Sequence, residues 1–577
     1  MIKFVPKYIY FWVFPQSFVV FPEYFIVICF IYILIVFVLV NYNIYGLLVQ
    51  RALSECVSVI LIMVCYLIAN DMKIGINFLT FNDSIINDYL AFFTKFLVCF
   101  FSAIYFFIIA DYLKEQKLIA FEYLLVIFAI LGLMFLCNSN DLLTAYLAIE
   151  LSSFGFYILA SFKKVSNYSV ESGIKYFVTG AISSSFFLLG SSFIYGFLGS
   201  IKFKDIFILF GSSNFDYLPC EAMVINNESE NFACSITFFL QTLIQTDYEF
   251  FNFNFLELGL ILILFSLFIK LALVPFHLWS LDVYEGSPTS STFFFTVITK
   301  LSIFVLLIRI CYLCFFELNE YWRFYSLWTG LLSIFIGSFG GLKQRKLKTL
   351  LAYSSISHMG YSLIAFSAAN CLGIQILFIY LVIYMLSGLC VWSIFLFTRL
   401  KYKNFDKYNK ELNDLVLLRK SNSGLAFALA LTMFSIAGIP PLVGFLAKMG
   451  VFLSIMDLVG NYDQPWPFFT TFEINIAWVS FVKIALISIL FSVVSTFYYI
   501  RIIKVLYFET LLIGKLYYSI NNKKTIMFSI LIFSLIFLFV NPGVLYLLTT
   551  KVILSLELFN SDMLSVFYYY SSILYKY

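Results

Sequence analysis

The sequence predicts an all-α membrane protein that crosses the bilayer about fourteen times. Hydrophobic residues make up 62% of its 577 residues and charged residues only 12%, whereas about a quarter of the residues in a soluble domain are charged. The mean hydropathy is +0.96. Apolar runs about 20 residues long, the length that a spanning helix needs, recur along the chain. These observations exclude a water-soluble protein.

The predicted spans are continuous apolar segments separated by short polar ones. Their approximate bounds, in chain order, are 24–40, 52–70, 89–110, 119–137, 142–161, 171–197, 257–278, 289–314, 324–340, 349–367, 371–398, 424–456, 475–500 and 526–548. The first 20 residues lack the charged start and the small-residue cleavage site of a removable signal. We therefore expect no signal peptide.

The basic residues of the connecting segments provide an independent check on the number of spans. Segments that follow odd-numbered spans carry 21 Lys and Arg residues, whereas segments that follow even-numbered spans carry 4. Because loops on the inner side of a membrane are enriched in Lys and Arg, this separation supports fourteen spans. It predicts that both termini lie outside and the 399–423 segment inside. The long segment 201–256, with several acidic residues, is predicted to be a solvated outer insertion.

Four ionisable residues lie well inside predicted spans, where a charge costs at least ~2.5–3.5 kcal/mol and marks a functional candidate. Glu150 lies on the fifth span, Lys270 on the seventh, Lys300 on the eighth and Lys448 on the twelfth. A carboxylate and an ammonium that lie close together stabilise each other's charge, and a buried ammonium without its partner releases its proton more readily. We predict that these four residues belong to a buried proton-transfer axis.

Three further ionisable side chains are weaker candidates for this axis. Lys175, near the inner end of the sixth span, either joins the axis or reaches the membrane interface. The interface also suits Lys95 and Lys483, which lie near helix ends. His358, surrounded by hydroxyl residues on the tenth span, is either a proton relay or a satisfied core histidine. We expect His277, at the inner end of the seventh span, to be structural or part of a channel exit.

Two of the lysine-bearing spans contain prolines, which remove a backbone donor and open the helical hydrogen-bond ladder. Pro275 follows Lys270 by five residues, and Pro440 and Pro441 precede Lys448. In a membrane, carbonyls freed by such a break must line a cavity or bind water. Broken helices with lysines at similar places in two halves are typical of transporters with inverted repeats. A simple kink is the alternative for either proline alone.

This pattern divides the chain into four predicted regions. Residues 1–118 hold the first three spans, and residues 119–323 hold spans four to eight as the first repeat, including the insertion 201–256. Residues 324–510 hold spans nine to thirteen as the second repeat. Residues 511–577 hold the last span and a C-terminal tail.

Redox and metal sites are not predicted in this chain. The sequence contains no glycine-rich nucleotide-binding motif, and its 11 cysteines mostly lie inside apolar runs, as packed small side chains would. Cys311 and Cys314 form a C-x-x-C motif without a second pair, and the chain has only 2 histidines. The net charge of +4 gives no argument for nucleic-acid binding. We expect the chain to move charge without doing redox chemistry.

Five strings of the sequence carry a resemblance to a known family. They are AIELSSFGFYILASF, ESGIKYFVTGAISSSFFLLGSSFIYG, KLALVPFHLWSLDVYEGSPTSSTFFFTVITK, KQRKLKTLLAYSSISHMGYSLIAF and SIAGIPPLVGFLAKMGVF. In this order they resemble the chain 2 family of NADH–ubiquinone oxidoreductase (respiratory complex I), whose members are related to the bacterial N subunit. The resemblance covers about 115–510, and the insertion 201–256 departs from it.

The resemblance implies a fourteen-helix fold with two inverted five-helix repeats and broken helices seven and twelve. It places the family's proton-transfer residues at Glu150, Lys270, Lys300 and Lys448, and its helix-six lysine at Lys175. It also implies a proton-pumping subunit of the membrane arm, driven by quinone reduction elsewhere, in the mitochondrial inner membrane beside other antiporter-like subunits. Flavin, iron–sulfur clusters and quinone would be bound by other subunits, with no cofactor or metal in this chain.

Two other functions remain as alternatives. A free-standing cation/proton antiporter of the related family would share the fold, the lysines and the broken helices. A structural membrane scaffold, inert in transport, would tolerate neutralisation of Glu150 or Lys270. A bacterial or chloroplast homologue of the same chain would change the location but not the mechanism.

Overall fold

The computed structural model describes most of the chain between residues 20 and 556. The described residues are 20–39, 42–74, 78–116, 121–163, 166–212, 255–316, 318–401, 406–408, 411–416, 418–461, 481–509, 516–517 and 522–556. Most of the predicted insertion 201–256 and the C-terminal tail therefore lie outside the described residues.

Helices make up almost all of the described structure. Those of the first half are α2 (Phe21–Leu39), α3 (Tyr42–Ile74), α4 (Tyr89–Gln116), α5 (Phe121–Asn138), α6 (Leu142–Ala160), α7 (Asn167–Leu198), α8 (Phe203–Ser212), a helix over 255–271, α10 (Leu278–Gly286), α11 (Thr289–Val297), α12 (Thr299–Ile308) and the π-helix η4 (Arg309–Cys314). Those of the second half are α13 (Asn319–Leu342), α14 (Leu347–Ser367), α15 (Cys371–Phe397), the 3-10 helix η5 (Leu412–Leu415), α16 (Leu418–Ser421), α17 (Ser423–Ala437), α18 (Val443–Asn461), α19 (Phe481–Tyr507), α20 (Asn522–Val540) and α21 (Gly543–Ser555).

The structure is that of an all-helical polytopic membrane protein. Within the described residues, eight helices are long and apolar enough to cross a membrane, or nine if the bent pair α20–α21 is one span. Because a bilayer core offers no water to backbone groups, helices satisfy those groups within each segment. Only short strands occur, namely β1 (Phe78–Thr80), β2 (Ile85–Asn87), β3 (Arg399–Lys401), β4 (Asp406–Tyr408) and β5 (Leu516–Tyr517).

Three predicted spans differ from a straight helix. The span predicted over 257–278 ends its first helix at residue 271, and the span predicted over 424–456 is divided between α17 and α18. The sequence predicts both breaks from their prolines. The span predicted over 526–548 covers parts of two helices, α20 and α21, which meet at 80° beside Pro542 and form one span only as a bent pair. Proline cannot donate its backbone hydrogen bond and so ends α20 there.

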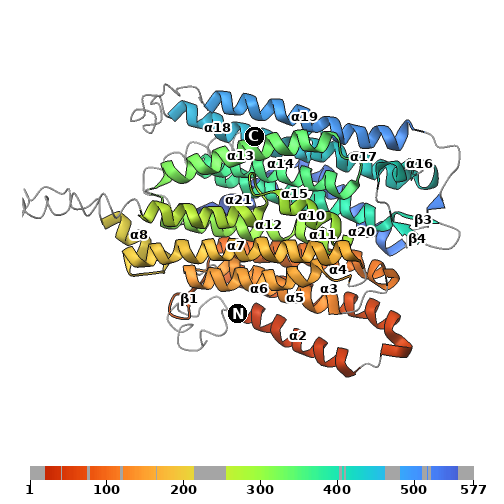
Figure 1. Ribbon diagram of the computed structural model, residues 1–577, viewed down its shortest axis with the longest axis horizontal. Coiled ribbons are helices and arrows are strands. Elements are labelled where there is room, and N and C mark those ends of the chain that lie inside the picture. Colours follow the sequence, from red (N-terminus) through yellow and green to blue (C-terminus); the bar gives the residue numbers. More distant parts are fainter. Residues whose placement is uncertain are drawn as a thin grey trace, which may run out of the picture.

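Loops assigned to the outer side by the charge pattern contact one another. β1 and β2 form an antiparallel hairpin. Backbone bridges join Ile85 to Ser139 and Asp141 to Lys202, and so connect the segments that follow the second, fourth and sixth predicted spans. β1 and α8 accordingly lie at the same end of the bundle (Figure 1).

Loops assigned to the inner side gather at the opposite end. β3 pairs antiparallel with both β4 and β5, so the segments after the eleventh and thirteenth predicted spans share one small sheet. Lys346 forms a backbone bridge with Glu411 and an ion pair with Glu285. The hydrogen bond from its ammonium to Glu285 raises the pKa of Lys346. β3, β4 and α16 lie together at this end (Figure 1).

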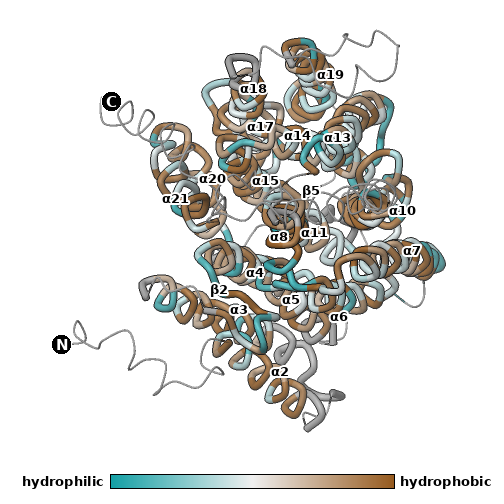
Figure 2. Tube along the Cα trace, turned by 90° about the vertical axis from the view of Figure 1, so that its left-hand side faces the viewer, coloured by the Kyte–Doolittle hydropathy of each residue, from teal (hydrophilic) through white to brown (hydrophobic). Residues whose placement is uncertain are grey.

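The bundle has a buried centre and lateral apolar faces. Buried apolar side chains from α2 to α21 form one continuous cluster. Within an 18-residue apolar stretch of each helix, 89% of the residues are buried in the α11–η4 span and in α15, against 28% in α7 and in α19. In the end-on view, α2 and α3 lie at one edge of the bundle and α19 at the other (Figure 2). Functional side chains on α12 and α15 are therefore shielded on all sides.

Candidate functional site

The first half of the candidate axis begins on one face of α6. Glu150, Ser153 and Tyr157 are spaced three and four residues apart, so their side chains lie on the same side of the helix. The Ser153 hydroxyl donates to the Glu150 backbone oxygen at 3.0 Å and lies 3.4 Å from its carboxylate Oε2. The other oxygen, Oε1, is buried and has no hydrogen-bond partner among the described residues.

Lys270 joins this face through Tyr157 rather than through a direct ion pair. Its Nζ lies 3.4 Å from the Tyr157 hydroxyl and 5.8 Å from the ring centre. A Cβ at Gly180 of α7 would overlap the Tyr157 hydroxyl, so the glycine makes room for it. Among the described residues, no carboxylate lies within 4 Å of Lys270. The sequence analysis did not single out Tyr157.

The helix break after Lys270 is satisfied by a side chain. Ala272 has a φ of 58°, and the Val274–Pro275 peptide bond is cis. The indole nitrogen of Trp279 donates to the Ile269 backbone oxygen at 3.0 Å. The predicted break is thus present, and a tryptophan binds one carbonyl at the break.

The second half of the candidate axis is centred on Lys300 of α12. This side chain is 3% exposed, and its Nζ lies 3.3 Å from the Tyr384 hydroxyl and 5.1 Å from the centre of that ring. Tyr384 belongs to α15, the most central helix. Lys300 is therefore deeply buried beside a tyrosine and, like Lys270, is not ion-paired with any described carboxylate.

His358 of α14 uses both ring nitrogens. Nδ1 lies 2.7 Å from the Tyr380 hydroxyl, and Nε2 lies 3.2 Å from the Tyr499 hydroxyl. The Tyr499 hydroxyl in turn lies 3.4 Å from that of Tyr498. Both ring nitrogens of His358 are therefore hydrogen-bonded, as expected for a satisfied core histidine. The hydroxyls of Tyr499 and Tyr498 extend this contact, so the proton relay stays a prediction.

Lys448 of α18 lies across the second helix break. It is 5% exposed, and its Nζ donates to the Ala437 backbone oxygen at 2.7 Å. Gly438 ends α17 in the left-handed conformation, with a φ of 81°. A Cβ at Gly438 would lie 2.7 Å from Cδ of Lys448. The break therefore supplies both an acceptor for the ammonium and space for its stem.

A small cavity of about 20 Å³, enough for about one water molecule, joins these groups. Its lining includes Lys448, His358, Tyr384 and Ser435. The Ser435 hydroxyl is buried and has no hydrogen-bond partner in the described part of the chain. Because Tyr384 also contacts Lys300, a polar route connects Lys300 with Lys448. A polar cavity of this kind can hold water, and water with hydroxyl groups can relay protons.

The remaining lysine candidates lie outside this buried route. Lys175 is 44% exposed, and its Nζ lies 2.7 Å from Glu171 and 2.6 Å from Asp282. Lys95 is instead fully buried, with its Nζ 2.5 Å from Glu23. The expectation that Lys95 reaches the interface is wrong, because a carboxylate from another helix holds it inside.

The cysteines are buried or partly buried thiols for the most part. Cys311 and Cys314 are both buried within η4, and neither forms a disulfide. Within the described residues, no group of three His, Cys, Asp or Glu side chains is placed to hold a metal ion.

Paired helix breaks beside buried lysines, at the centre of an apolar helical bundle, define the class of ion-translocating membrane proteins. The sequence model of the NADH:quinone oxidoreductase/Mrp antiporter transmembrane family matches residues 139–463. This range contains Glu150, Lys175, Lys270, Lys300 and Lys448, and also His358. The chain belongs to this family, on the branch of NADH:quinone oxidoreductase membrane subunits known as chain 2 or subunit N.

Individual relatives and a solved structure support this assignment. NADH-ubiquinone oxidoreductase chain 2 of Marchantia polymorpha is 35% identical over 447 residues, which cover 77% of this chain and 79% of that protein. NADH-quinone oxidoreductase subunit N of Paramagnetospirillum magneticum is 34% identical over 430 residues, covering 74% and 77%. A chain of respiratory complex I from Thermus thermophilus, 21% identical, shares the fold with a TM-score of 0.66 and covers 91% of this chain and 98% of that one.

Proposed function

We propose that this chain is a proton-translocating core subunit of the membrane arm of NADH:ubiquinone oxidoreductase (complex I), driven by quinone reduction elsewhere in the complex. It acts within an enzyme whose flavin, iron–sulfur clusters and quinone are bound by other subunits. It lies in the mitochondrial inner membrane as a multi-pass protein, beside other antiporter-like subunits. The family and the relatives named as oxidoreductase subunits support this function.

The proposed topology has fourteen spans and two inverted repeats. Residues 119–323 and 324–510 form the repeats, residues 1–118 precede them and residues 511–577 follow. The separation of the loops to two ends supports this arrangement, because each observed inter-loop bridge joins segments of the same predicted side. The two breaks are similar but not identical, since Lys270 precedes its break and Lys448 follows its break.

Protons are proposed to move between protonatable groups linked by hydroxyls. In the first half, Glu150, Ser153 and Tyr157 lead to Lys270. In the second half, Tyr384 and the cavity connect Lys300 to Lys448. That cavity is the single observation that carries the proposal, because it is lined by Lys448 and by Tyr384, whose hydroxyl contacts Lys300. Lys175 has a separate, surface role in this proposal.

The test compares lysines on the candidate axis with a buried lysine away from it. Lys448→Ala and Lys270→Ala are expected to reduce proton pumping about a hundredfold, the low end of what a positioned proton-transfer group contributes. Lys524 is the matched control, because it is 9% exposed and its Nζ donates to the Ile108 backbone oxygen, away from the cavity. Pumping and NADH oxidation with a soluble quinone are measured in vesicles and divided by the amount of assembled complex.

Each alternative function has its own outcome. Unchanged pumping in Lys448→Ala and Lys270→Ala, at normal assembly, would establish the inert scaffold instead. Cation/proton exchange by the isolated chain, without the other subunits, would establish the free-standing antiporter. Loss of pumping in Lys524→Ala to the same degree would show that any buried lysine has this effect, and would overturn the assigned axis.

A further inference from the structure

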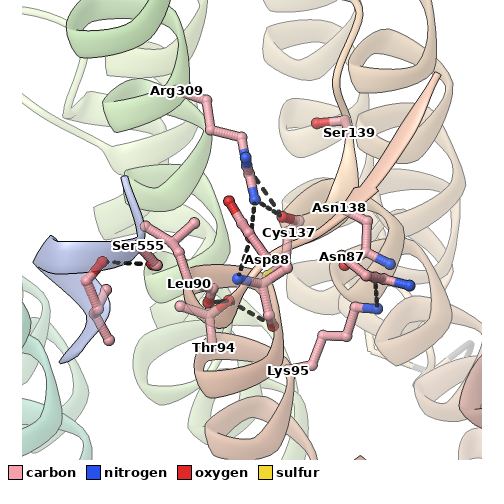
Figure 3. A network of polar contacts seen from close by, with 12 residues as sticks. Asn87, Asp88, Leu90, Thr94, Lys95, Cys137, Asn138, Ser139, Arg309 and Ser555 are labelled. Atoms are coloured by element: carbon pink, nitrogen blue, oxygen red, sulfur yellow. Dashed lines mark hydrogen bonds and ion pairs between the residues drawn. The ribbon is translucent and has the colours of Figure 1, made fainter. Parts of the chain in front are cut away.

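A second group of buried charges lies at the outer end of the bundle, away from the candidate axis. It consists of Glu23 of α2, Asp88 just before α4, Lys95 of α4, Asn138 at the end of α5 and Arg309 at the start of η4. Figure 3 shows the last four of these side chains. We call these five residues the outer ionic network. Four of them precede residue 139, where the match to the family begins.

Two ion pairs organise the outer ionic network. Lys95 Nζ lies 2.5 Å from Glu23 Oε1, which also accepts from Asn138 Nδ2 at 2.9 Å. Arg309 Nη2 lies 2.8 Å from Asp88 Oδ1. Asp88 Oδ1 additionally accepts from the Ala91 backbone at 2.8 Å, and so caps α4. With two carboxylates and two cations, the network carries no net formal charge.

These charges are buried more completely than stability requires. Glu23 and Lys95 are each 1% exposed and Arg309 is 0% exposed. Removing charges from water is costly, and apolar side chains of similar size often replace a buried ion pair without loss of stability. A buried pair is thus weak evidence for a purely stabilising role. A role in proton transfer is consistent with the two carboxylates of the network.

Three polar atoms of the outer ionic network have no protein partner. Glu23 Oε2, Asn138 Oδ1 and Arg309 Nη1 are buried and make no hydrogen bond to any described residue. The first two atoms accept hydrogen bonds and the third donates them. Buried water typically makes about three hydrogen bonds to otherwise unsatisfied groups of this kind. The network therefore has the donors and acceptors needed to hold water.

The network lies between the candidate axis and the outer surface. Arg309 follows Lys300 by nine residues along α12 and η4, a rise of about 14 Å. On the other side, Asp71 near the end of α3 is half-buried and interacts electrostatically with both Glu23 and Lys95. A proton that leaves the lysines toward the outer side meets the network first and Asp71 next.

We propose that the outer ionic network is a hydrated proton-release site of this subunit, an inference that rests on the proposed function. The Glu23 carboxylate accepts a proton through the enclosed water while its contact with Lys95 opens. It then gives the proton to Asp71, which faces the outer phase, and the pair with Lys95 closes again. The network gains one positive charge on loading and returns to neutrality on release.

The main test removes both charges of one pair together. The double variant Glu23→Gln/Lys95→Met keeps side-chain size and leaves no unpaired charge, so assembly is expected to be normal. Proton pumping per assembled complex is expected to fall about a hundredfold, as for loss of a positioned proton-transfer group. Glu23→Asp, which keeps the carboxylate, is expected to retain pumping. Normal assembly with normal pumping in the double variant would mean that the network only holds α2 in place, and would overturn the proposal.

A second measurement uses the unaltered complex and does not depend on folding of a variant. A density map that resolves ordered water in the whole complex is expected to show water within hydrogen-bond distance of Arg309 Nη1 and Glu23 Oε2. Dry atoms there would overturn the proposal. Lys448→Ala is assayed in parallel. If it loses pumping while the network variant does not, only the release site fails, whereas normal pumping in both would reject the proposed function itself.

Discussion

Each lysine of the candidate axis is placed against an aromatic ring rather than a carboxylate. The distances from Nζ to the ring centre are 5.8 Å for Lys270 over Tyr157, 5.1 Å for Lys300 over Tyr384 and 5.5 Å for Lys448 over Tyr361. A ring face stabilises an ammonium by ~0.5–2 kcal/mol, which is less than a hydrogen-bonded ion pair in the same surroundings. The three lysines of the axis are therefore held by weaker contacts than Lys95, whose Nζ forms an ion pair with Glu23.

The hydroxyl of Tyr384 is predicted to matter more than the hydroxyl of a neighbouring buried tyrosine. Tyr384→Phe removes the contact between Lys300 and the cavity lining. A hydrogen bond of about 1 kcal/mol corresponds to a reduction of pumping of about fivefold, measured in vesicles at equal assembly. Tyr361→Phe is the control, because it keeps the ring over Lys448 and loses hydroxyl bonds to the Ser488 backbone and the Ser492 side chain, not to a lysine. Equal losses in both variants would contradict a relay through Tyr384.

The sequence identifies charged members of the site more easily than their partners. Glu150 and the three lysines stand out because charges are rare in apolar runs. Tyr157 and Tyr384 do not stand out, because 21% of the residues are aromatic and a tyrosine in such a background carries no signal. Arg309 lies inside the predicted eighth span, and the position of this arginine could have indicated the outer ionic network.

At the scale of elements, the helix breaks position the site. Carbonyls near the two breaks bind side chains, Ile269 with Trp279 and Ala437 with Lys448. A carbonyl at the second break thus binds Lys448 of the candidate axis directly. At the first break, Lys270 instead contacts the Tyr157 hydroxyl. Prolines in the sequence predict both breaks, but which side chain fills each one depends on tertiary packing.

Gly438 is predicted to be required for the position of Lys448. In Gly438→Ala, the new Cβ would be strained at a φ of 81° and would meet Cδ of Lys448 at 2.7 Å. We expect a loss of about 1 kcal/mol or more of stability and reduced pumping as the ammonium leaves the Ala437 oxygen. The measurements are the melting temperature of the complex and vesicle pumping.

The matched control is Gly196→Ala on α7. A Cβ at Gly196 would have no atom within 4 Å, and alanine favours a helix over glycine by up to about 1 kcal/mol. Unchanged or slightly increased stability is expected there. A Gly438→Ala complex with normal pumping would show that Lys448 does not depend on the break.

The bend between α20 and α21 shows the limit of span prediction. Hydropathy identifies 526–548 as apolar but does not distinguish one straight helix from two helices at 80°. Pro542 was the available signal, and the Gln375 side chain of α15 donates to the Tyr546 backbone oxygen in the bent part. Pro542 thus indicates where α20 ends, whereas the 80° angle between the two helices goes with tertiary contacts such as that of Gln375, which no local pattern contains.

At the scale of the whole molecule, charge and loop contacts give the same two-sided arrangement. Lys and Arg counts assign each loop to a side, and the small sheet of β3, β4 and β5 and the bridges of β2 join only loops of one assigned side. Two independent physical signals thus support a topology in which loops after odd-numbered spans lie on one side of the membrane and loops after even-numbered spans lie on the other. The fold class and the alternation were accessible from the sequence, whereas the burial of α15 and the exposure of α7 required the structure.

This alternation predicts which loops react from which side. Asn82 lies in the exposed turn between β1 and β2, and Arg345 lies in the exposed segment before α14, where its backbone oxygen accepts from Leu412. β1 and the β3–β4 sheet lie at opposite ends of the bundle (Figure 1). Cys56, the exposed cysteine among the described residues, and Cys220 and Cys234, which lie outside the described residues, are first replaced by serine. Asn82→Cys is then expected to react with a membrane-impermeant maleimide added outside. Arg345→Cys is expected to react only from inside, since the loops rich in Lys and Arg face inward.

The two sites control for each other within one preparation. In right-side-out vesicles the external maleimide should label Asn82→Cys, and in inside-out vesicles it should label Arg345→Cys. Detergent should allow labelling of both variants. Labelling of both variants from one side would mean that the number of spans between residues 82 and 345 is even. An even number would break the separation of basic residues, and would also place the outer ionic network and the β3–β4–β5 sheet on the same side of the membrane. The release site would then lose its outlet, because Asp71 would no longer face the phase opposite to the basic loops.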